Sequence, residues 1–427
     1  MRAPGTRTAI VLTLVGLLTV ATGLTIRAAG GGLGAPLAPF FASWDPHVDT
    51  YALIGLPVVA LSLAAAIPLL RGRGGAWGFV AGAFAIALAA RLGLSLVRDG
   101  ADGWYAVFGS GPEAANEYLP VLPAVDSLGL REFLDRFAEL SPTLPIHPSA
   151  HPPGILVLLD VTAIDGPRAF AAVVILIGAA AAPLSWALAR RLGIEEGRAR
   201  AAAMMIAFSP AALLYGVLST DAMFATLGLI AAVLLVGSGA GSWLGGALAL
   251  AVASFFSWAL LAIGAFAAIV QLLRRGIGPA IAMAAIAGAV LVAFYLLLQA
   301  LTGFDPIGSI RAAGDAYALG ISNARPYLFW LFGSPVAFAV ALGIPTAWYA
   351  ARALGTGDPA AIGLAAIVVV SVLIGLTKAE TERIWLFMGP LAAVAAATLV
   401  PVRRMPAICC LLVAQAIITQ ILLDTVW

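Results

Sequence analysis

Long runs of apolar residues fill most of the chain, and charged or Gly/Pro-rich breaks separate each run from the next. A helix needs about 20 apolar residues to cross the hydrocarbon core of a bilayer, and most of these runs approach that length. The pattern therefore predicts thirteen transmembrane helices. Their expected ranges are 9–27, 51–70, 77–97, 167–189, 199–216, 221–237, 242–256, 257–273, 279–300, 328–350, 360–376, 384–400 and 406–424. Residues 242–273 would exceed one bilayer crossing as a single helix, so two spans are expected there.

The composition agrees with this pattern, because 62% of the 427 residues are hydrophobic and only 10% are charged. Soluble domains carry about 25% charged residues, so a soluble enzyme, a disordered protein and a nucleic-acid-binding protein are excluded. We expect an all-α polytopic membrane protein in which residues 1–427 form one integral membrane domain. Arginine supplies 22 of the 23 basic residues, which is typical of a GC-rich bacterium and indicates the bacterial plasma membrane. Cys409 and Cys410 are adjacent in an apolar run and predict no disulfide.

The charges are divided unevenly between the two predicted faces. If the N-terminus is cytoplasmic, the inner segments hold thirteen basic and three acidic residues, and the rest of the chain holds ten basic and eighteen acidic residues. Basic residues concentrate in cytoplasmic loops, so the N-terminus is expected inside and the C-terminus outside. The first run follows Arg2 and Arg7 as in a signal peptide, but its apolar stretch exceeds the usual ~7–15 residues. We therefore expect an uncleaved first span.

Residues 98–166 form the longest polar stretch and are expected to lie outside. After the cap residues Asp126 and Ser127, apolar residues recur at helical spacing, namely Leu130, Phe133, Leu134, Phe137 and Leu140. A helix of about fourteen residues is too short to span the bilayer, so an amphipathic helix lying flat on the outer surface is expected. The charges on its other face, with the i,i+4 pairs Arg131–Asp135 and Glu132–Arg136, indicate a solvated face.

All three histidines are expected outside, together with several carboxylates. In the first outer loop, Asp45, His47 and Asp49 are interpreted as a base, a metal site or a solvated turn. His147 and His151 stand among prolines that favour an extended backbone, which indicates substrate binding or a rigid loop. A metal site is the third alternative, and it would need Asp45, His47 or Glu117 as further ligands.

Two further outer turns carry charge beside apolar helices. Asp221 begins the sixth predicted span, where it is either a helix N-cap or a functional carboxylate. The second turn holds Lys378, Glu380, Glu382 and Arg383 within six residues. Charges held close to hydrocarbon are costly and tend to be functional, so this second cluster is a candidate site.

The order of these motifs resembles the GT-C superfamily of membrane glycosyltransferases, in particular the branch of protein O-mannosyltransferases and lipid A aminoarabinose transferases. In that branch an acidic residue followed by Tyr precedes a Lys-Pro-Pro or His-Pro-Pro segment, and here Glu117-Tyr118 and His151-Pro152-Pro153 are similar. Ala189-Arg190-Arg191-Leu192, Ser209-Pro210 and Asp221 also match family positions in order. The element 380–385 resembles a late outer loop of uncharacterised actinobacterial members. The resemblance covers about residues 100–390.

The resemblance implies a GT-C-like fold and transfer of a mannose- or arabinose-type sugar from a polyprenyl-phosphate donor. The acceptor would be a hydroxyl of a glycan, lipid or protein at the extracytoplasmic face, and the transfer would invert the anomeric centre during cell-envelope assembly. Such chemistry needs a base for the acceptor proton and cations for the leaving phosphate. It implies Glu117 as the base. Substrate-binding residues are expected among His147, His151, Asp221, Arg325, Lys378, Glu380, Glu382 and Arg383. Of these, Arg383 and Lys378 are the main candidates for binding the phosphate, and Arg325 is a further candidate.

One departure leaves the base open. The family's acid usually follows the first span, whereas Glu117 follows the third. Either an extra helix pair precedes the common core, which we favour, or Asp45 and Asp49 carry the base. A divalent metal is an open alternative, and no cofactor is otherwise expected.

Two rival functions fit a polytopic membrane protein. A lipid flippase or small-solute transporter predicts ionisable groups deep inside the spans, where Arg91 is the one cation we find. A non-catalytic envelope scaffold predicts that Glu117 is dispensable.

Overall fold

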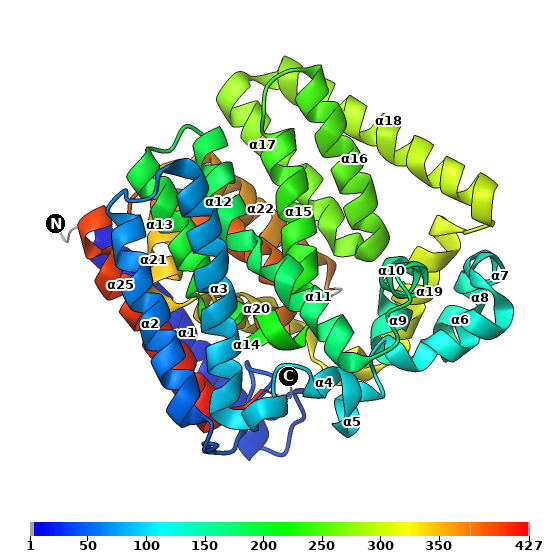
Figure 1. The fold of residues 1–427 in the computed structure, drawn as a ribbon, viewed down its shortest axis with the longest axis horizontal. Coiled ribbons are helices and arrows are strands. Elements are labelled where there is room, and N and C mark those ends of the chain that lie inside the picture. Colours follow the sequence, from blue (N-terminus) through cyan, green and yellow to red (C-terminus); the bar gives the residue numbers. More distant parts are fainter. Residues whose placement is uncertain (1–3, 376, 426–427) are drawn as a thin grey trace. The chain divides into compact units, whose positions relative to one another are not determined.

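The computed structural model describes residues 4–375 and 377–425 and is nearly all-helical in this part of the chain (Figure 1). Arg2 of the predicted first inner segment and Leu376 of the predicted eleventh span lie outside the described residues. The chain forms two compact units. The first comprises residues 1–104, 174–229 and 324–427, and the second comprises residues 105–173 and 230–323.

The first unit is built mainly from long apolar helices. Its α-helices and strands are α1 (Pro4–Ala28), β1 (Ser43–Trp44), α2 (Ala52–Leu70), α3 (Gly75–Asp99), α12 (Ala181–Arg191), α13 (Glu196–Ala207), α14 (Pro210–Leu218), α20 (Tyr327–Ala341), α21 (Ile344–Gly355), α22 (Pro359–Ile374), α23 (Thr381–Ile384), α24 (Gly389–Ala397), α25 (Met405–Leu422) and β2 (Leu423–Asp424). Helices α11 (Pro167–Ala179) and α15 (Asp221–Leu235) begin in one unit and end in the other.

The second unit combines short helices in its N-terminal segment with longer apolar helices. They are α4 (Ala106–Gly109), α5 (Gly111–Ala114), α6 (Leu122–Leu128), α7 (Leu130–Asp135), α8 (Phe137–Leu140), α9 (Ile146–Ala150), α10 (Gly154–Val161), α16 (Ala240–Phe256), α17 (Ala262–Arg275), α18 (Ile277–Thr302) and α19 (Pro306–Leu319). Short 3₁₀ helices also occur in the chain. They lie at 119–121, 141–143 and 258–261 in the second unit, at 100–102, 386–388 and 402–404 in the first, and at 321–324 where the two units meet in the sequence.

Among the residues that the structure describes, seven helical segments are long and apolar enough to cross a membrane. The number rises to as many as nine if each of two bent helix pairs counts as one span. The bent pairs are α13 with α14, at 52°, and α20 with α21, at 116°. This supports a polytopic α-helical membrane protein. The predicted span 384–400 contains a helix of only nine residues, α24, which is buried throughout among α12, α13, α21 and α22. The number thirteen stays a prediction.

Close helix packing in the first unit depends on small residues. Helices α2 and α3 lie side by side (Figure 1). A Cβ added at Gly55 would lie 2.3 Å from the carbonyl oxygen of Gly93, so only glycine lets the two backbones approach this closely. Between transmembrane helices there is no hydrophobic driving force of the aqueous kind, and close backbone contact therefore contributes to association.

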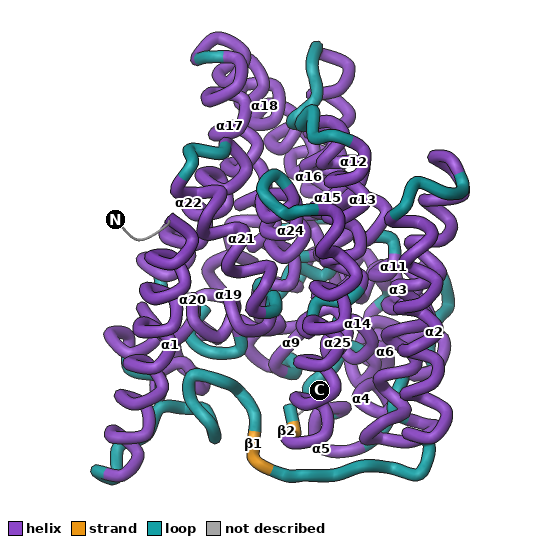
Figure 2. The backbone as a smooth tube through the Cα atoms, turned by 90° about the vertical axis from the view of Figure 1, so that its left-hand side faces the viewer, coloured by secondary structure: helices purple, strands orange, loops and turns teal. Residues whose placement is uncertain are grey.

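In the first unit, loops predicted to lie on the same side of the membrane contact each other. The first outer loop meets the C-terminal end of the chain through the antiparallel pair β1–β2 (Figure 2). On the predicted inner side, Arg200 donates to the carbonyl oxygens of Leu69 and Arg73, and Arg198 donates to that of Thr398. Segments predicted to share a side are thus bonded to each other, which agrees with their predicted grouping. Which of the two sides is cytoplasmic stays a prediction.

We expect an impermeant thiol reagent to label Ser110→Cys but not Thr356→Cys in intact cells. Both residues are exposed, and the predicted topology places Ser110 outside and Thr356 inside. The measurement uses a background in which Cys409 and Cys410 are replaced by alanine, with permeabilised cells as the control in which both sites react. The opposite labelling pattern would mean that the orientation is inverted.

The predicted amphipathic helix is amphipathic but not continuous. Phe133, Leu134 and Phe137 are buried, and the charged face is largely exposed, as expected. However, the segment is divided into α6, α7 and α8, because Gly129 adopts φ +77° and Arg136 leaves helical geometry. Asp126 and Ser127 lie inside α6 and do not cap a helix. Of the two predicted ion pairs, Arg136–Glu132 is present at 3.8 Å.

Candidate functional site

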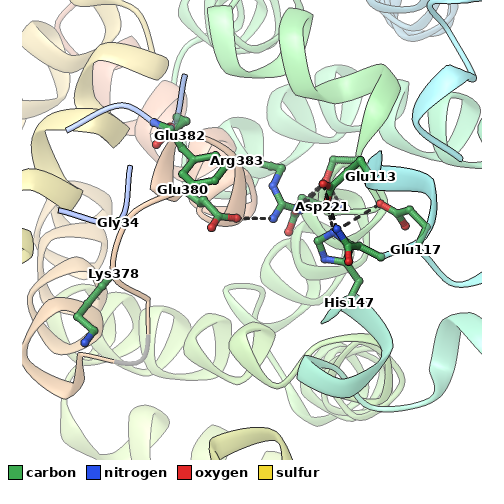
Figure 3. A network of polar contacts seen from close by, with 12 residues as sticks. Gly34, Glu113, Glu117, His147, Asp221, Lys378, Glu380, Glu382 and Arg383 are labelled. Carbon is green, nitrogen blue, oxygen red and sulfur yellow. Dashed lines mark hydrogen bonds and ion pairs between the residues drawn. The ribbon is translucent and has the colours of Figure 1, made fainter. Parts of the chain in front are cut away.

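The first unit contains a buried chain of ion pairs, which we call the arginine cluster: Asp221, Arg325, Glu380 and Arg383 (Figure 3). Arg383 Nη1 lies 3.0 Å from Asp221 Oδ2, and Arg383 Nη2 lies 3.0 Å from Glu380 Oε2. The other oxygen of Glu380, Oε1, accepts a hydrogen bond from Arg325 Nη2. Both arginines and Asp221 are at most 5% exposed. The two guanidinium groups therefore converge on one carboxylate.

Local structure positions each member of the cluster. Asp221 is the first residue of α15, and Ser219 accepts the backbone N–H of Asp221 while donating its own O–H to the Asp221 carboxylate at 2.6 Å. The capping-type bond at this helix start is thus made by Ser219, and the Asp221 carboxylate pairs with Arg383 instead. The side chain of Asp221 therefore does not act as an N-cap, and a functional role for it stays a prediction.

Arg325 also fastens the first outer loop to the cluster. Its Nη1 donates to the carbonyl oxygen of Lys378 at 2.6 Å and its Nε donates to that of Gly34 at 3.3 Å. Its guanidinium lies over the ring of Phe41, 5.4 Å from the centroid. Gly34 has φ +66°, and a Cβ there would lie 2.6 Å from Arg325 Cγ, so glycine is required at this close approach.

The turn that carries Glu380 has an unusual backbone. Ala379 and Glu380 have φ of +65° and +56°, a region that non-glycine residues rarely occupy. Each such residue costs on the order of 1–3 kcal/mol and persists only where its surroundings hold it. Here Ala379 is fully buried in a core with Leu33, Phe329 and Trp330, and the two arginines hold the Glu380 side chain.

The charges of the cluster shift the acid–base behaviour of its neighbours. Burial acts to raise the pKa of Glu380, but the cations of Arg383 and Arg325 outweigh it and leave that pKa below its usual value. Lys378 has a lowered pKa, first because of partial burial and second because of the Arg325 cation. Glu380 is therefore a carboxylate at neutral pH.

Glu382 belongs to the same turn but has a different environment. It is 4% exposed, and its Oε1 accepts the backbone N–H of Phe41 at 2.6 Å. Its Oε2 has no hydrogen-bond partner among the described residues. Burial raises its pKa from 4.5 to about 7. Glu382 thus exchanges a proton near neutral pH and links the 377–385 turn to the first outer loop.

We expect Glu382 to make the protein less stable as the pH rises from about 5 to 8. Its folded-state pKa of about 7 lies above the 4.5 of the ordinary group, so the folded state binds more protons between these values and the free energy of unfolding falls with pH. The loss from this group is at most about 3 kcal/mol. The measurement is the unfolding temperature of detergent-solubilised protein across this pH range.

In Glu382→Gln this part of the pH dependence should disappear. Asp126→Asn, which removes an exposed carboxylate of α6, is the matched control and should keep the wild-type slope. Identical slopes for Glu382→Gln and the wild type would show that Glu382 does not titrate in this range.

The second unit contains a separate polar group, which we call the histidine cluster: Glu113, Asn116, Glu117 and His147 (Figure 3). His147 Nε2 lies 3.3 Å from Glu113 Oε1 and 3.6 Å from Glu117 Oε1. Asn116 donates to Glu113 Oε2 at 3.2 Å, and the carbonyl oxygen of Asn116 accepts the backbone N–H of His147. Glu117 is 2% exposed. One imidazole therefore lies close to two carboxylates, one of them deeply buried.

His147 of the histidine cluster lies in a short helix, whereas the neighbouring prolines had led us to expect an extended backbone. The expected extended backbone is wrong for Ile146–Ala150, which forms α9 with Pro145 at its N-cap and Pro148 in its first turn. Proline is tolerated in a first helical turn because the N–H it lacks has no partner within the helix there. His151 follows in an extended conformation, as expected, and is half-buried.

The alternative base residues lie in more exposed surroundings. Asp45 pairs with Arg98 at 2.6 Å while 62% of its side chain stays exposed, and Asp49 accepts the backbone N–H of Tyr51 at 2.8 Å. His47 is exposed, and its backbone N–H bonds to the carbonyl oxygen of Ile421. These contacts are those of a loop fastened to its neighbours, and they favour the solvated-turn reading of Asp45, His47 and Asp49. Among the residues that the structure describes, no group of three His, Cys, Asp or Glu side chains is placed to hold a metal ion.

Sequence reasoning missed Glu113, Ser219 and the backbone of Phe41. Glu113 stands only four residues before Glu117, and this closeness in the sequence is the signal that would have found it. No sequence signal joins Phe41 to Glu382, because they are 341 residues apart in the chain.

The fold and these two clusters define a polytopic α-helical membrane protein with buried charged groups in loops between apolar helices. Comparisons with protein-family models, with curated proteins and with solved structures find no match for this chain.

Proposed function

We propose that this protein is a GT-C-like membrane glycosyltransferase that uses a polyprenyl-phosphate sugar donor. The proposal includes thirteen spans, a bacterial plasma membrane location and an active extracytoplasmic face. The acceptor is a hydroxyl group of a glycan, lipid or protein, and the product belongs to the cell envelope. Its main support is the arginine cluster, in which two buried guanidinium groups converge on one anionic position beside apolar helices.

The geometry of each cluster supports the role proposed for it. Arginine forks match the oxygens of a phosphate and remain charged at every working pH, so Arg383 and Arg325 suit a leaving phosphate. Lys378 adds a third cation next to Arg325. Glu117 is a buried carboxylate that lies 3.6 Å from the imidazole of His147, which suits a general base.

Glu117 takes the proton of the acceptor hydroxyl while the acceptor oxygen forms a bond to the anomeric carbon. The bond between that carbon and the phosphate oxygen breaks, and the polyprenyl phosphate leaves with the electron pair. The negative charge on the leaving oxygen grows in the transition state, and the arginine cations stabilise it most at that point. Attack opposite to the leaving group inverts the anomeric centre.

The direct test is transfer of radiolabelled sugar by purified protein in liposomes. Polyprenyl-phosphate mannose, arabinose and other sugars are supplied one at a time with cell-envelope extract as the acceptor. With one of the donors, we expect the label to move from the lipid donor to an acceptor in the extract. Label that stays on every donor would contradict the proposal.

Arg91 supports a second candidate, a lipid flippase or small-solute transporter. It lies within the candidate span 75–102 and is 2% exposed, and its Nε and Nη1 have no hydrogen-bond partner among the described residues. A cation inside a span usually marks a transport path. However, it packs against Gly178 and Gly216 in the last turns of α11 and α14, where helix dipoles stabilise a cation structurally. In the liposome assay, a donor that crosses the bilayer with its sugar attached would favour the transporter.

A further inference from the structure

The two arginines of the arginine cluster have a similar pattern of hydrogen bonds. In Arg325, Nη1 and Nε are bonded to backbone carbonyl oxygens, and Nη2 is directed at Glu380. In Arg383, Nη1 is bonded to Asp221, and Nη2 is again directed at Glu380. Structural partners therefore fix both guanidinium groups, while their Nη2 atoms meet at a single anion position.

The Glu380 carboxylate occupies that position with one oxygen for each arginine. A phosphate ester also presents two or more anionic oxygens to neighbouring guanidinium groups, and it carries charge more densely than a carboxylate. The geometry that holds Glu380 is thus one that a phosphoryl group satisfies equally well.

The backbone of Glu380 stores strain in this state. Ala379 and Glu380 both have positive φ, and the side-chain bonds to the two arginines help to hold them there. If the carboxylate left the arginines, Glu380 would be free to return to ordinary backbone geometry, and the relief would offset part of the cost of breaking its ion pairs.

We propose that the Glu380 carboxylate is an internal substitute for a phosphoryl ligand of Arg325 and Arg383, and that the ligand displaces it on binding. This inference rests on the proposed function for the expectation that the phosphate is a lipid headgroup. Displacement leaves two buried cations, Arg325 and Arg383, facing the phosphoryl ligand, with Asp221 still orienting Arg383. Without a ligand, the Glu380 carboxylate balances the charge of the two arginines, so no unpaired cation is left buried beside hydrocarbon.

The test measures phosphate binding by the full-length protein in nanodiscs, independently of sugar transfer. Inorganic phosphate is added in one arm and a polyprenyl phosphate is incorporated in the nanodisc in the other, and ³¹P NMR titration or calorimetry gives the dissociation constants. Tight binding in the lipid arm alone identifies a lipid headgroup, and equal binding in both arms identifies free phosphate as a sufficient ligand.

Glu380→Gln keeps the size of the side chain but removes the competing charge, so phosphate affinity should rise about tenfold or more. The matched control is Glu139→Gln, which removes a carboxylate that bonds Arg136 in an exposed pair and should leave the affinity unchanged. Ala379→Gly relaxes the strained turn while Glu380 stays in place, so it should lower the affinity several-fold. The two substitutions in the turn are thus expected to change the phosphate affinity in opposite directions.

An unchanged or lower affinity in Glu380→Gln, for protein that keeps its wild-type elution profile, would overturn the inference. If Glu380→Gln does not fold, the test rests on the phosphate affinity of Ala379→Gly. An unchanged affinity in that variant would then overturn the inference. Raised phosphate affinity without transfer from any sugar donor would support the inference and contradict the glycosyltransferase.

Discussion

Glu117→Gln is expected to lower the rate of sugar transfer by a factor of about 10² to 10⁴, while donor binding stays near the wild-type value. The substitution keeps the shape of a buried side chain and removes its ability to accept a proton from the acceptor hydroxyl. Glutamine has the size of glutamate, and the 3.6 Å separation of Glu117 Oε1 from His147 Nε2 leaves room for the amide, so folding should be nearly intact. The measurement is the initial rate of label transfer in liposomes at saturating donor.

Three further variants separate the base from its neighbours. Asp45→Asn and Asp49→Asn should have milder effects, because these carboxylates bond Arg98 and the backbone of Tyr51 in exposed surroundings. Glu113→Gln should have an intermediate effect, because it changes the orientation of His147 rather than the proton acceptor. Near-normal turnover in Glu117→Gln together with an inactive Asp45→Asn or Asp49→Asn would move the base to the first outer loop.

Arg383→Lys is expected to raise the KM for the lipid donor by about tenfold or more. A lysine ammonium is a compact charge that does not reproduce the two directed N–H groups now bonded to Asp221 and Glu380. Arg383→Ala should in addition lower the free energy of unfolding by about 3–5 kcal/mol, because it leaves the buried carboxylate of Asp221 without its cation. Donor titrations and denaturation of the purified variants measure the two effects.

Arg136→Lys is the matched control for Arg383→Lys. Arg136 also bonds a carboxylate with two N–H groups, but in an exposed ion pair that contributes little to stability. Neither the KM nor the stability should change in this variant. Donor affinity that remains normal in Arg383→Lys would remove Arg383 from the proposed phosphate site.

Hydropathy predicted the position of most helices because a membrane helix must satisfy its own backbone hydrogen bonds and cover them with apolar side chains. That requirement is local, so it can be read residue by residue along the chain. Apolar runs such as 51–70 and 279–300 became α2 and α18 almost at the predicted bounds. The buried face of the outer segment, with Phe133 and Phe137, was also predicted from its spacing.

The same local reasoning failed where the chain bends or shortens. A run of apolar residues at 328–350 reads as one span, but the structure has a 116° bend between α20 and α21 near Gly343, whose φ is +91°. Hydropathy does not report bends, because a bent and a straight helix bury similar side chains. Gly129 likewise divides the amphipathic segment.

The sequence by itself determined that this is a membrane protein, where its apolar helices run, and that loops on one predicted face carry charged and imidazole side chains. It also drew attention to Glu117, Asp221 and Arg383. Only the tertiary structure decided which of these groups meet. Arg383 pairs with Asp221 across 162 positions of the chain, and Glu380 pairs with Arg325 across 55. Such pairs form because a buried charge must find an opposite charge nearby, and which one is nearby depends on how the helices pack rather than on their order in the sequence.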